Sequence, residues 1–411
     1  MAKIWYISKY ASVPPAQAGN RGYRLLEGFR AKGHQIRLIC SSSNHLEEPR
    51  EEKSPGFSGS EILRIGAPRY QRGESLARLL SWVIFDFRVA ILSVPDTDRP
   101  DFIIASSPSL LTPISAYLLA KRTGARLVVE VRDIWPLTGT EEYGYSPRHP
   151  LVLFARFIEK FAYENSDGIV GLMPRLNLHV KTVTRKSSPV TAIGLGVDSE
   201  IPLPAPLPSS RKSGEPLVVG YAGTLGKSNA MEAFFQAAEL LQHNDSFVFE
   251  VAGSGDLADH FSKRFASLPN LQMHGQVPRI DALNFMRRCH VLYFSSPVTK
   301  IGQFGQSLNK IVDYMSTGRP ILGSYSGFLT MLNEADAGWV IPADDPVGLV
   351  RSLKLIEKES VSSLNRKGRN GFEWISKHRS YSRLASDYLD FLFSLAAGSN
   401  GPASATTQKS R

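Results

Sequence analysis

Short apolar runs alternate with segments of helical periodicity along the first half of the chain. The runs are rich in β-branched and aromatic residues, as strands are. We expect strands at 3–8, 35–41, 61–65, 102–106, 126–131, 168–171 and 190–193. Amphipathic helices are expected between most of them, for example at 23–32 and 110–122. This alternation predicts a parallel sheet that is covered by helices on both faces.

The pattern breaks at residues 201–216, where four prolines precede a short polar stretch that ends at Gly214. Such a composition is typical of an exposed linker. Strand-like runs then resume at 217–222, 247–252, 271–274, 291–294, 320–323 and 338–341. We therefore predict an α/β protein with two Rossmann-like domains, over residues 1–200 and 217–375. Open parallel sheets bind ligands at the carboxyl ends of their strands, so two such domains that face each other predict a cleft.

The end of the chain adds two more segments. A helix at 376–395 is expected to cross back to the N-terminal domain, and the small, polar residues 396–411 predict a disordered tail. No stretch has the length and apolar character of a membrane span, and the N-terminus lacks the features of a signal peptide. Cys40 and Cys289 predict buried free thiols, which suits a reducing cytosol.

The formal net charge of +10 favours anionic partners, such as nucleotide phosphates or a membrane surface. The basic residues are spread along the chain without a recognised nucleic-acid module, so nucleic acid is not an expected partner. Residues 64–92 alternate arginines with aromatic residues. That segment contains either a helix that dips into a membrane interface or a helix packed on the first sheet with snorkelling arginines.

The most informative segment spans residues 302–320. Its apolar positions follow the spacing of a buried helix face: Leu308, Ile311, Val312 and Met315. Gly302 and Gly305 precede this helix, which places a glycine-bearing loop where backbone N–H groups and the helix dipole attract phosphate. Asp313, about one turn inside the helix, can accept both hydroxyls of a ribose, and Lys310 adds a cation. Spacing alone leaves open a helix whose Asp and Lys are merely solvated.

This segment resembles the donor-binding motif of the retaining glycosyltransferase family 4, which has the GT-B fold. It most resembles a bacterial branch that builds surface polysaccharides such as O-antigen and capsule. The matching residues are Gly305, Ser307, Asn309, Lys310, Asp313, Tyr314, Met315, Gly318, Arg319 and Pro320, while Leu308 replaces the usual proline. The broader family has two acidic residues eight positions apart. Asp313 matches the second, which grips the ribose, but Gly305 stands where the first contacts the donor sugar.

Residues 220–227 resemble the strand and loop that carry the family's basic diphosphate ligands. Lys227 matches one of these ligands, whereas Thr224 stands where many members have arginine. The resemblance implies donor contacts from Gly223, Thr224 and Lys227, with Lys227 acting in catalysis by stabilising the departing diphosphate. The residue by itself also suits a loop lysine in water.

Two segments of the first domain complete the resemblance. Residues 130–136 resemble the family's Asp-x-Trp-Pro motif at a strand end, which implies a catalytic Asp133 and an acceptor-side Arg132. The alternative is an Arg–Asp surface pair beside a packed tryptophan. The loop at 18–22 resembles the family's glycine loop, which approaches the acceptor and the donor phosphates. Its implied contacts are Gly19, Asn20 and Arg21.

The resemblance covers nearly the whole chain and implies a hexosyl- or N-acetylhexosaminyl-type transferase. The 1–200 domain would bind a lipid-linked saccharide acceptor, and the 217–375 domain a nucleotide-diphosphate sugar, with UDP ahead of GDP. We expect no metal and no cofactor, because the sequence offers no metal-ligand cluster and charge stabilisation carries such reactions. The expected location is the cytoplasm, at the inner face of the membrane. The rival interpretations are a GT-B nucleotide-sugar 2-epimerase and a non-catalytic GT-B partner subunit.

Overall fold

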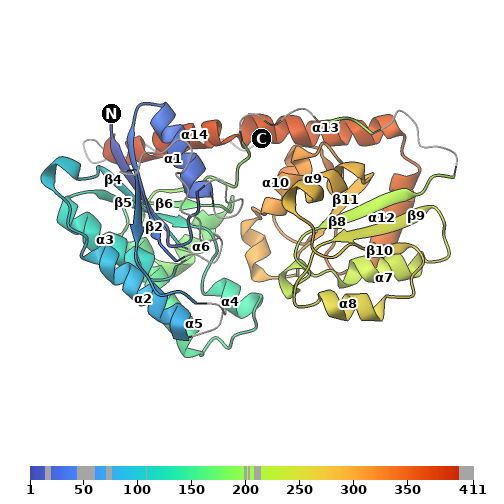
Figure 1. The fold of residues 1–411 in the computed structure, drawn as a ribbon, viewed down its shortest axis with the longest axis horizontal. Coiled ribbons are helices and arrows are strands. Elements are labelled where there is room, and N and C mark those ends of the chain that lie inside the picture. Colours follow the sequence, from blue (N-terminus) through green and yellow to red (C-terminus); the bar gives the residue numbers. More distant parts are fainter. Residues whose placement is uncertain are drawn as a thin grey trace. The chain divides into compact units, whose positions relative to one another are not determined.

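The chain divides into two compact α/β units (Figure 1). The computed structural model describes residues 1–13, 20–43, 61–70, 76–107, 109–198, 201, 204–207 and 214–397. Unit 1 contains residues 1–136 and 147–194 and the chain from 381 onward, and unit 2 contains residues 137–146 and 195–380. The short helix α4 (Leu137–Glu141) thus belongs to unit 2, although the sequence analysis assigned it to the first domain.

Unit 1 is built on a parallel seven-stranded sheet in the order β3-β2-β1-β4-β5-β6-β7. Its strands are β1 (Lys3–Ile7), β2 (Gln35–Ser41), β3 (Ile62–Ile65), β4 (Phe102–Ser106), β5 (Arg126–Val131), β6 (Gly168–Gly171) and β7 (Val190–Ala192). Its helices are α1 (Arg21–Ala31), α2 (Leu76–Ala90), α3 (Thr112–Thr123), α5 (Pro150–Asn165), α6 (Leu176–Val183) and α14 (Tyr381–Ala397), with a 3-10 turn η1 (Asp96–Asp98). Helices α1 and α14 lie on one side of the sheet, and α2, α3 and α5 on the other (Figure 1).

Unit 2 has a parallel six-stranded sheet in the order β10-β9-β8-β11-β12-β13. Its strands are β8 (Leu217–Ala222), β9 (Phe247–Ala252), β10 (Leu271–Met273), β11 (Val291–Ser295), β12 (Ile321–Ser324) and β13 (Gly338–Ile341). Its helices after α4 are α7 (Glu232–Leu240), α8 (Ala258–Arg264), α9 (Arg279–Arg288), α10 (Asn309–Ser316), α11 (Met331–Glu334), α12 (Pro346–Glu357) and α13 (Val361–His378). Two 3-10 turns, η2 (Lys227–Asn229) and η3 (Lys300–Phe304), precede α7 and α10.

Every strand expected from the apolar runs is present, with ends that differ by at most one residue. Both sheets are wholly parallel, as the alternation of strands and helices predicted. Each unit has its own aromatic-rich core. In unit 1 the ring of Phe29 on α1 meets that of Tyr388 on α14 edge to face, with ring centres 5.7 Å apart, and in unit 2 Phe235 stacks on Phe261 with ring centres 4.2 Å apart.

The proline-rich segment differs from the exposed linker that its composition predicted. Leu207 is buried in the unit 2 core, and its backbone N–H donates to Asn365 Oδ1 at 2.8 Å. The Arg319 guanidinium donates to the Ala205 carbonyl at 2.9 Å. Proline lacks an N–H donor but leaves the neighbouring backbone groups available, so residues 204–207 are attached to unit 2 through Leu207 and the Ala205 carbonyl, although Ala205 and Pro206 are exposed.

The C-terminal region contains two helices where a single one, at 376–395, was expected. Helix α13 ends at His378, and α14 begins at Tyr381 and belongs to unit 1. Of the expected tail, residues 396 and 397 are the last turn of α14 and the remainder lies outside the described residues.

Helix α14 packs against α1 at a point where both helices carry small residues. A Cβ added at Gly28 would lie 2.4 Å from the Cβ of Ala385, which is far inside contact distance. We therefore predict that Gly28→Ala lowers the free energy of unfolding by about 1–3 kcal/mol, as overpacked cores do. Ala385→Gly removes the opposing methyl group and so relieves the clash. The loss in the free energy of unfolding should therefore be smaller in the double variant than the sum of the two single losses, by about 1 kcal/mol or more. Urea unfolding of the three variants measures this coupling, and additive losses would contradict the helix contact.

Candidate functional site

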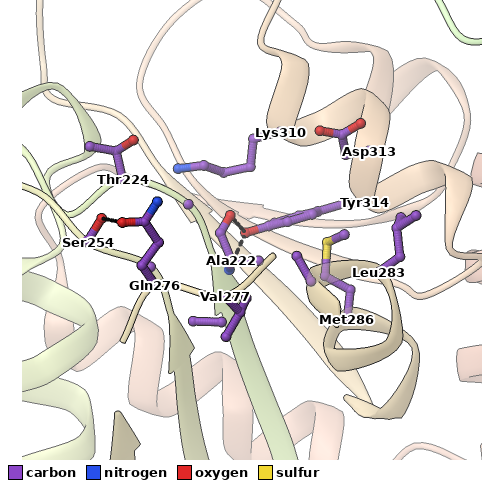
Figure 2. A pocket seen from close by; sticks show the side chains of 14 residues that line it. Ala222, Thr224, Ser254, Gln276, Val277, Leu283, Met286, Lys310, Asp313 and Tyr314 are labelled. Carbon is purple, nitrogen blue, oxygen red and sulfur yellow. Dashed lines mark hydrogen bonds between the residues drawn. The ribbon is translucent and has the colours of Figure 1, made fainter. Parts of the chain in front are cut away.

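A pocket of about 260 Å³ opens at the carboxyl ends of β8 and β9 in unit 2 (Figure 2). It is lined by Ala222, Gly223, Thr224, Ala252, Gly253, Ser254, Gln276, Val277, Ala282, Leu283, Met286, Lys310, Asp313 and Tyr314. Three of its walls are the segments that follow β8, β9 and β10, and the others come from α9 and α10. This is the edge of an open parallel sheet where ligands bind.

Helix α10 is held against the end of β8 by one tyrosine. The Tyr314 hydroxyl donates to the Ala222 carbonyl at 3.0 Å and accepts from the Ala222 N–H at 2.9 Å. The other buried residues of α10 are Ile311, Val312 and Met315, which follow the predicted apolar face. Because that face is buried, Lys310 and Asp313 are left on the side of the helix that lines the pocket (Figure 2).

Lys310 is the pocket's cation, and its ammonium is held by neutral groups. Its Nζ donates to Tyr221 Oη at 2.8 Å and to Asn229 Oδ1 at 2.6 Å, and it lies 4.3 Å from the centre of the Tyr221 ring. Among the described residues, no carboxylate forms an ion pair with it. Desolvation lowers the pKa of Lys310 to about 7, because nothing nearby compensates its charge.

The pocket gathers four of the donor residues that the sequence indicated, namely Gly223, Thr224, Lys310 and Asp313. The others lie elsewhere in unit 2. Lys227 is exposed in η2 and does not line the pocket. Ser307 Oγ accepts from the Leu195 N–H at 3.1 Å, and Asn309 is an exposed first residue of α10.

The two residues just before α10 have backbone rather than side-chain features. Gly305 ends η3 in a buried position with φ 91° and ψ −176°. Leu308 occupies the N-cap position of α10 in an extended conformation and provides no side-chain cap. The first N–H groups of α10 are therefore not capped by the Leu308 side chain, which is the arrangement that anion binding requires.

Sequence reasoning did not single out several residues of the pocket. Two of them are linked, since the Ser254 hydroxyl donates to Gln276 Oε1 at 3.4 Å. Gln276 and Ser254 both follow strands, and position after a strand is the signal that could have indicated them. Met286 is different, because nothing in the spacing of α9 separates a pocket residue from a core residue.

In unit 1, Arg132 and Asp133 follow β5, where the sequence analysis expected them. The Arg132 N–H donates to Ser107 Oγ at 3.0 Å, and the Asp133 side chain is exposed. Asp133 also borders a small cavity of about 40 Å³ together with Trp135 and Glu159. The Asp133 carboxyl thus lies at the carboxyl end of a strand, where desolvation by its surroundings raises its pKa.

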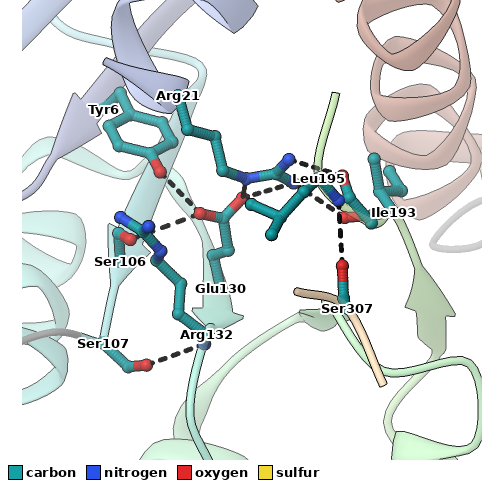
Figure 3. A network of polar contacts seen from close by, with 10 residues as sticks. Tyr6, Arg21, Ser106, Ser107, Glu130, Arg132, Ile193, Leu195 and Ser307 are labelled. Carbon is teal, nitrogen blue, oxygen red and sulfur yellow. Dashed lines mark hydrogen bonds and ion pairs between the residues drawn. The ribbon is translucent and has the colours of Figure 1, made fainter. Parts of the chain in front are cut away.

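Arg21 is a buried structural residue rather than an exposed binding residue (Figure 3). Its side chain is 2% exposed and pairs with the fully buried Glu130 at 3.2 Å. Its Nη1 and Nη2 donate to the Gly194 and Ile193 carbonyls at 2.6 and 2.8 Å. Because these partners occupy the guanidinium, Arg21 stabilises the fold of unit 1 and is not placed to contact an acceptor.

Glu130 is the centre of this buried network. Burial by itself raises the pKa of the carboxyl, but the Arg21 charge and the Tyr6 hydrogen bond outweigh it and hold the pKa below its usual value.

Asn20, the N-cap residue of α1, provides no side-chain cap hydrogen bond. Gly19, the remaining residue expected to approach phosphate, lies outside the described residues.

Two other features are absent from the part of the chain that the structure describes. No group of three or more His, Cys, Asp or Glu side chains there is placed to hold a metal ion. No helix in the same residues has both the length and the hydropathy to cross a bilayer.

Comparison with known proteins matches both units to glycosyltransferase families. Residues 18–196 match the glycosyl transferase 4-like domain, and residues 216–357 match glycosyl transferases group 1. The chain is 22% identical over 375 residues to the probable glycosyltransferase WbjE of Pseudomonas aeruginosa, covering 89% of this chain and 92% of that protein.

Solved structures with the same fold cover almost all of the chain. Sucrose-phosphate synthase from Thermosynechococcus elongatus has a TM-score of 0.69 at 15% identity, covering 97% of this chain and 100% of that one. Anabaena HepE in complex with UDP and glucose has a TM-score of 0.66 at 13% identity, covering 96% and 100%. With two parallel-sheet units, a pocket at the strand ends of the second and family matches across both, the chain is a glycosyltransferase of the GT-B fold.

Proposed function

We propose that unit 2 binds a nucleotide-diphosphate sugar in the strand-end pocket and that the enzyme transfers the sugar, with retention, to a saccharide acceptor bound by unit 1. The observation that carries this proposal is that Lys310 and Asp313, three residues apart on α10, line the same pocket as the turn at Gly223 and Thr224. A cation and a carboxylate about one turn apart suit a phosphate and a ribose on the same ligand.

The donor is assigned to the pocket part by part. Asp313 accepts hydrogen bonds from the ribose hydroxyls, while Lys310 and the first N–H groups of α10 donate hydrogen bonds to the diphosphate. The base lies toward Gln276, Val277 and Met286, where one polar side chain adjoins two apolar ones. The relatives support a nucleotide donor, because HepE is known in complexes with UDP and with UDP-glucose. We propose UDP ahead of GDP on this ground.

Charge stabilisation of the leaving group is the proposed source of catalysis. The bond between the sugar and the diphosphate breaks while the acceptor hydroxyl forms the new bond on the same face, and the leaving phosphate oxygen takes the acceptor proton. A cation beside that oxygen stabilises the developing charge without taking part in proton transfer. The exposed Asp133 of unit 1 is proposed to contact the acceptor, with Arg132 beside it.

The proposed acceptor is a lipid-linked saccharide, and the proposed product is an intermediate of a bacterial surface polysaccharide. The match to WbjE supports a bacterial glycosyltransferase, and another structural neighbour is the lipopolysaccharide outer core galactosyltransferase WaaB. An acceptor of this kind places the enzyme in the cytoplasm, at the inner face of the membrane. A hexose or N-acetylhexosamine is the proposed transferred sugar.

Nucleotide binding provides the first test. A ligand that binds only the folded state raises the melting temperature, so one of UDP, GDP, ADP, dTDP and CMP should raise it. Asp313→Ala should remove most of this shift, because the ribose loses its carboxylate. The matched control is Asp245→Ala, an exposed aspartate in the turn before β9, at the opposite end of the sheet. If none of the nucleotides shifts the wild-type protein, a non-catalytic partner subunit becomes the better interpretation.

The two candidate phosphate cations can be separated by substitution. Lys310→Met should weaken binding of the preferred nucleotide sugar by about tenfold or more, as expected for the loss of a charge-assisted contact. Lys227→Met should weaken it by less, because Lys227 is exposed outside the pocket. Isothermal titration measures both affinities, and a larger loss in Lys227→Met would return the main phosphate contact to that residue.

The lowered pKa of Lys310 adds a pH dependence. Below about pH 7 the amine is already charged, whereas above it the free protein must take up a proton to bind the diphosphate. Affinity for a nucleotide sugar should therefore fall as pH rises from about 6.5 to 8.5, by up to about tenfold per unit. Lys310→Arg stays charged and should show no such slope. Nucleotide sugars suit this test because their phosphodiester oxygens do not titrate near neutrality.

A further inference from the structure

Three helices on one side of the unit 1 sheet expose large apolar side chains together. On α2 and directly after it these are Leu79, Leu80, Val83, Phe87 and Ile91, on α3 Leu118, and on α5 Leu153, Phe154 and Phe157. Each is between 46% and 62% exposed. We call these nine residues the apolar face. Single exposed leucines are ordinary, whereas a contiguous group marks an interaction surface.

The apolar face is a consequence of how α2 is fixed to the unit. Its opposite side is buried and polar in part, since Asp86 accepts from Ser115 at 2.8 Å and Ser81 accepts from the buried Lys9 at 2.8 Å. Phe85 and Val89 on the same side of α2 are also fully buried. The remaining large side chains at 79, 83, 87 and 91 recur every four residues and therefore form one stripe that points away from the sheet.

The stripe on α2 continues across its neighbours. Helix α3 packs against both α2 and α5, and the Tyr117 ring on α3 meets the Phe161 ring on α5 edge to face, with ring centres 5.2 Å apart. All three helices lie on the same side of the sheet in Figure 1. Residues at 153, 154 and 157 of α5 form a second stripe, so the apolar face spans more than one helix.

The exposed charges on the three helices themselves have one sign. Within the described part of α2, α3 and α5, every exposed charged side chain is a cation: Arg88, Lys121, Arg122, Arg156 and Lys160. The Arg88 and Arg122 guanidinium groups also donate to the Gly66 and Ala90 carbonyls. Asp86 and Glu159 on these helices are buried, and the half-buried Glu164 pairs with Lys160 at 3.8 Å. A protein interface normally mixes charges of both signs at its rim, whereas apolar side chains ringed by cations match an anionic lipid surface.

We infer that the outer faces of α2, α3 and α5 form a membrane-docking surface, on which the apolar side chains enter the interface and the surrounding lysines and arginines meet anionic headgroups. This inference rests on the proposed function only for its purpose, which is to bring unit 1 to a lipid-linked acceptor. It combines the two alternatives left open for residues 64–92, because α2 is packed on the sheet on one side and faces outward with apolar residues on the other.

The test uses the full chain and liposomes of phosphatidylcholine alone or with about 30 mol% phosphatidylglycerol. Wild-type protein should float with the anionic vesicles at low salt and bind the neutral ones more weakly. Phe87→Ser with Phe157→Ser should reduce the bound fraction by about tenfold, because binding scales with buried apolar area. Arg156→Glu with Lys160→Glu should abolish the preference for anionic vesicles.

The matched control replaces two equally exposed apolar residues of unit 2, Leu240 at 60% and Leu355 at 64%, with serine. It should bind vesicles as the wild type does, with an unchanged melting temperature. Two results would overturn the inference: a wild type that does not float with anionic vesicles at low salt, or equal losses in the control and the Phe87/Phe157 variant. A dimer in solution that Phe87→Ser with Phe157→Ser dissociates would assign the apolar face to a second copy of the chain.

Nucleotide-induced stabilisation separates this inference from the proposed function. It should be the same in the wild type and in all three double variants, because none of the substituted residues lines the pocket. Vesicle binding without any nucleotide effect would leave the docking surface standing and the donor site refuted. The reverse result would refute the surface alone.

Discussion

The strand-end pocket of unit 2 depends on one tyrosine hydroxyl. Tyr314 satisfies both backbone groups of Ala222, so the end of β8 and the second turn of α10 are tied by two hydrogen bonds in a buried position. A buried backbone group that lost this partner would bear a desolvation cost of about 1–3 kcal/mol. The same contact sets the rotation of α10 about its axis and so decides which residues of the helix face the pocket. Lys310 and Asp313 owe their positions to it.

Unit 1 uses a different device at the end of its own sheet. Glu130, the fifth residue of β5, is fully buried and carries a charge that Arg21, Tyr6 and Ser106 stabilise. Removing one partner of such a pair leaves an uncompensated buried charge, so the network is more sensitive to single substitutions than its net contribution to stability suggests. It fixes the start of α1 to β5, and Asp133 follows on the same chain segment. The two units therefore organise their strand ends by opposite means, a neutral hydroxyl in one and an ion pair in the other.

The fold was predictable from the sequence, because polar or glycine-containing turns bound each β-branched run. Each run is a strand of one of the two parallel sheets. The part of the site on α10 was predictable for a similar reason: helical periodicity alone places Asp313 off the apolar face. Lys227 and Lys310 could not be ranked in this way, since their difference depends on which loop reaches the strand end. Arg21 misled the sequence analysis, because no local pattern tells a buried arginine from an exposed one when its partner Glu130 lies more than a hundred residues away. The apolar stripes of α2 and α5 were equally ambiguous, because periodicity shows that a helix has an apolar face but not whether another element covers it.

Gly305 differs from an acidic residue at this position in its backbone conformation as well as in its missing carboxylate. With φ at 91°, its backbone occupies a region that residues with a Cβ rarely adopt, and the position is buried. An acidic residue could return there only if the loop between η3 and α10 changed its path. The departure from the two-acid pattern is thus recorded in the main chain as well as in the side chain. Placing a carboxylate at this position would therefore require a redesigned loop rather than a single substitution.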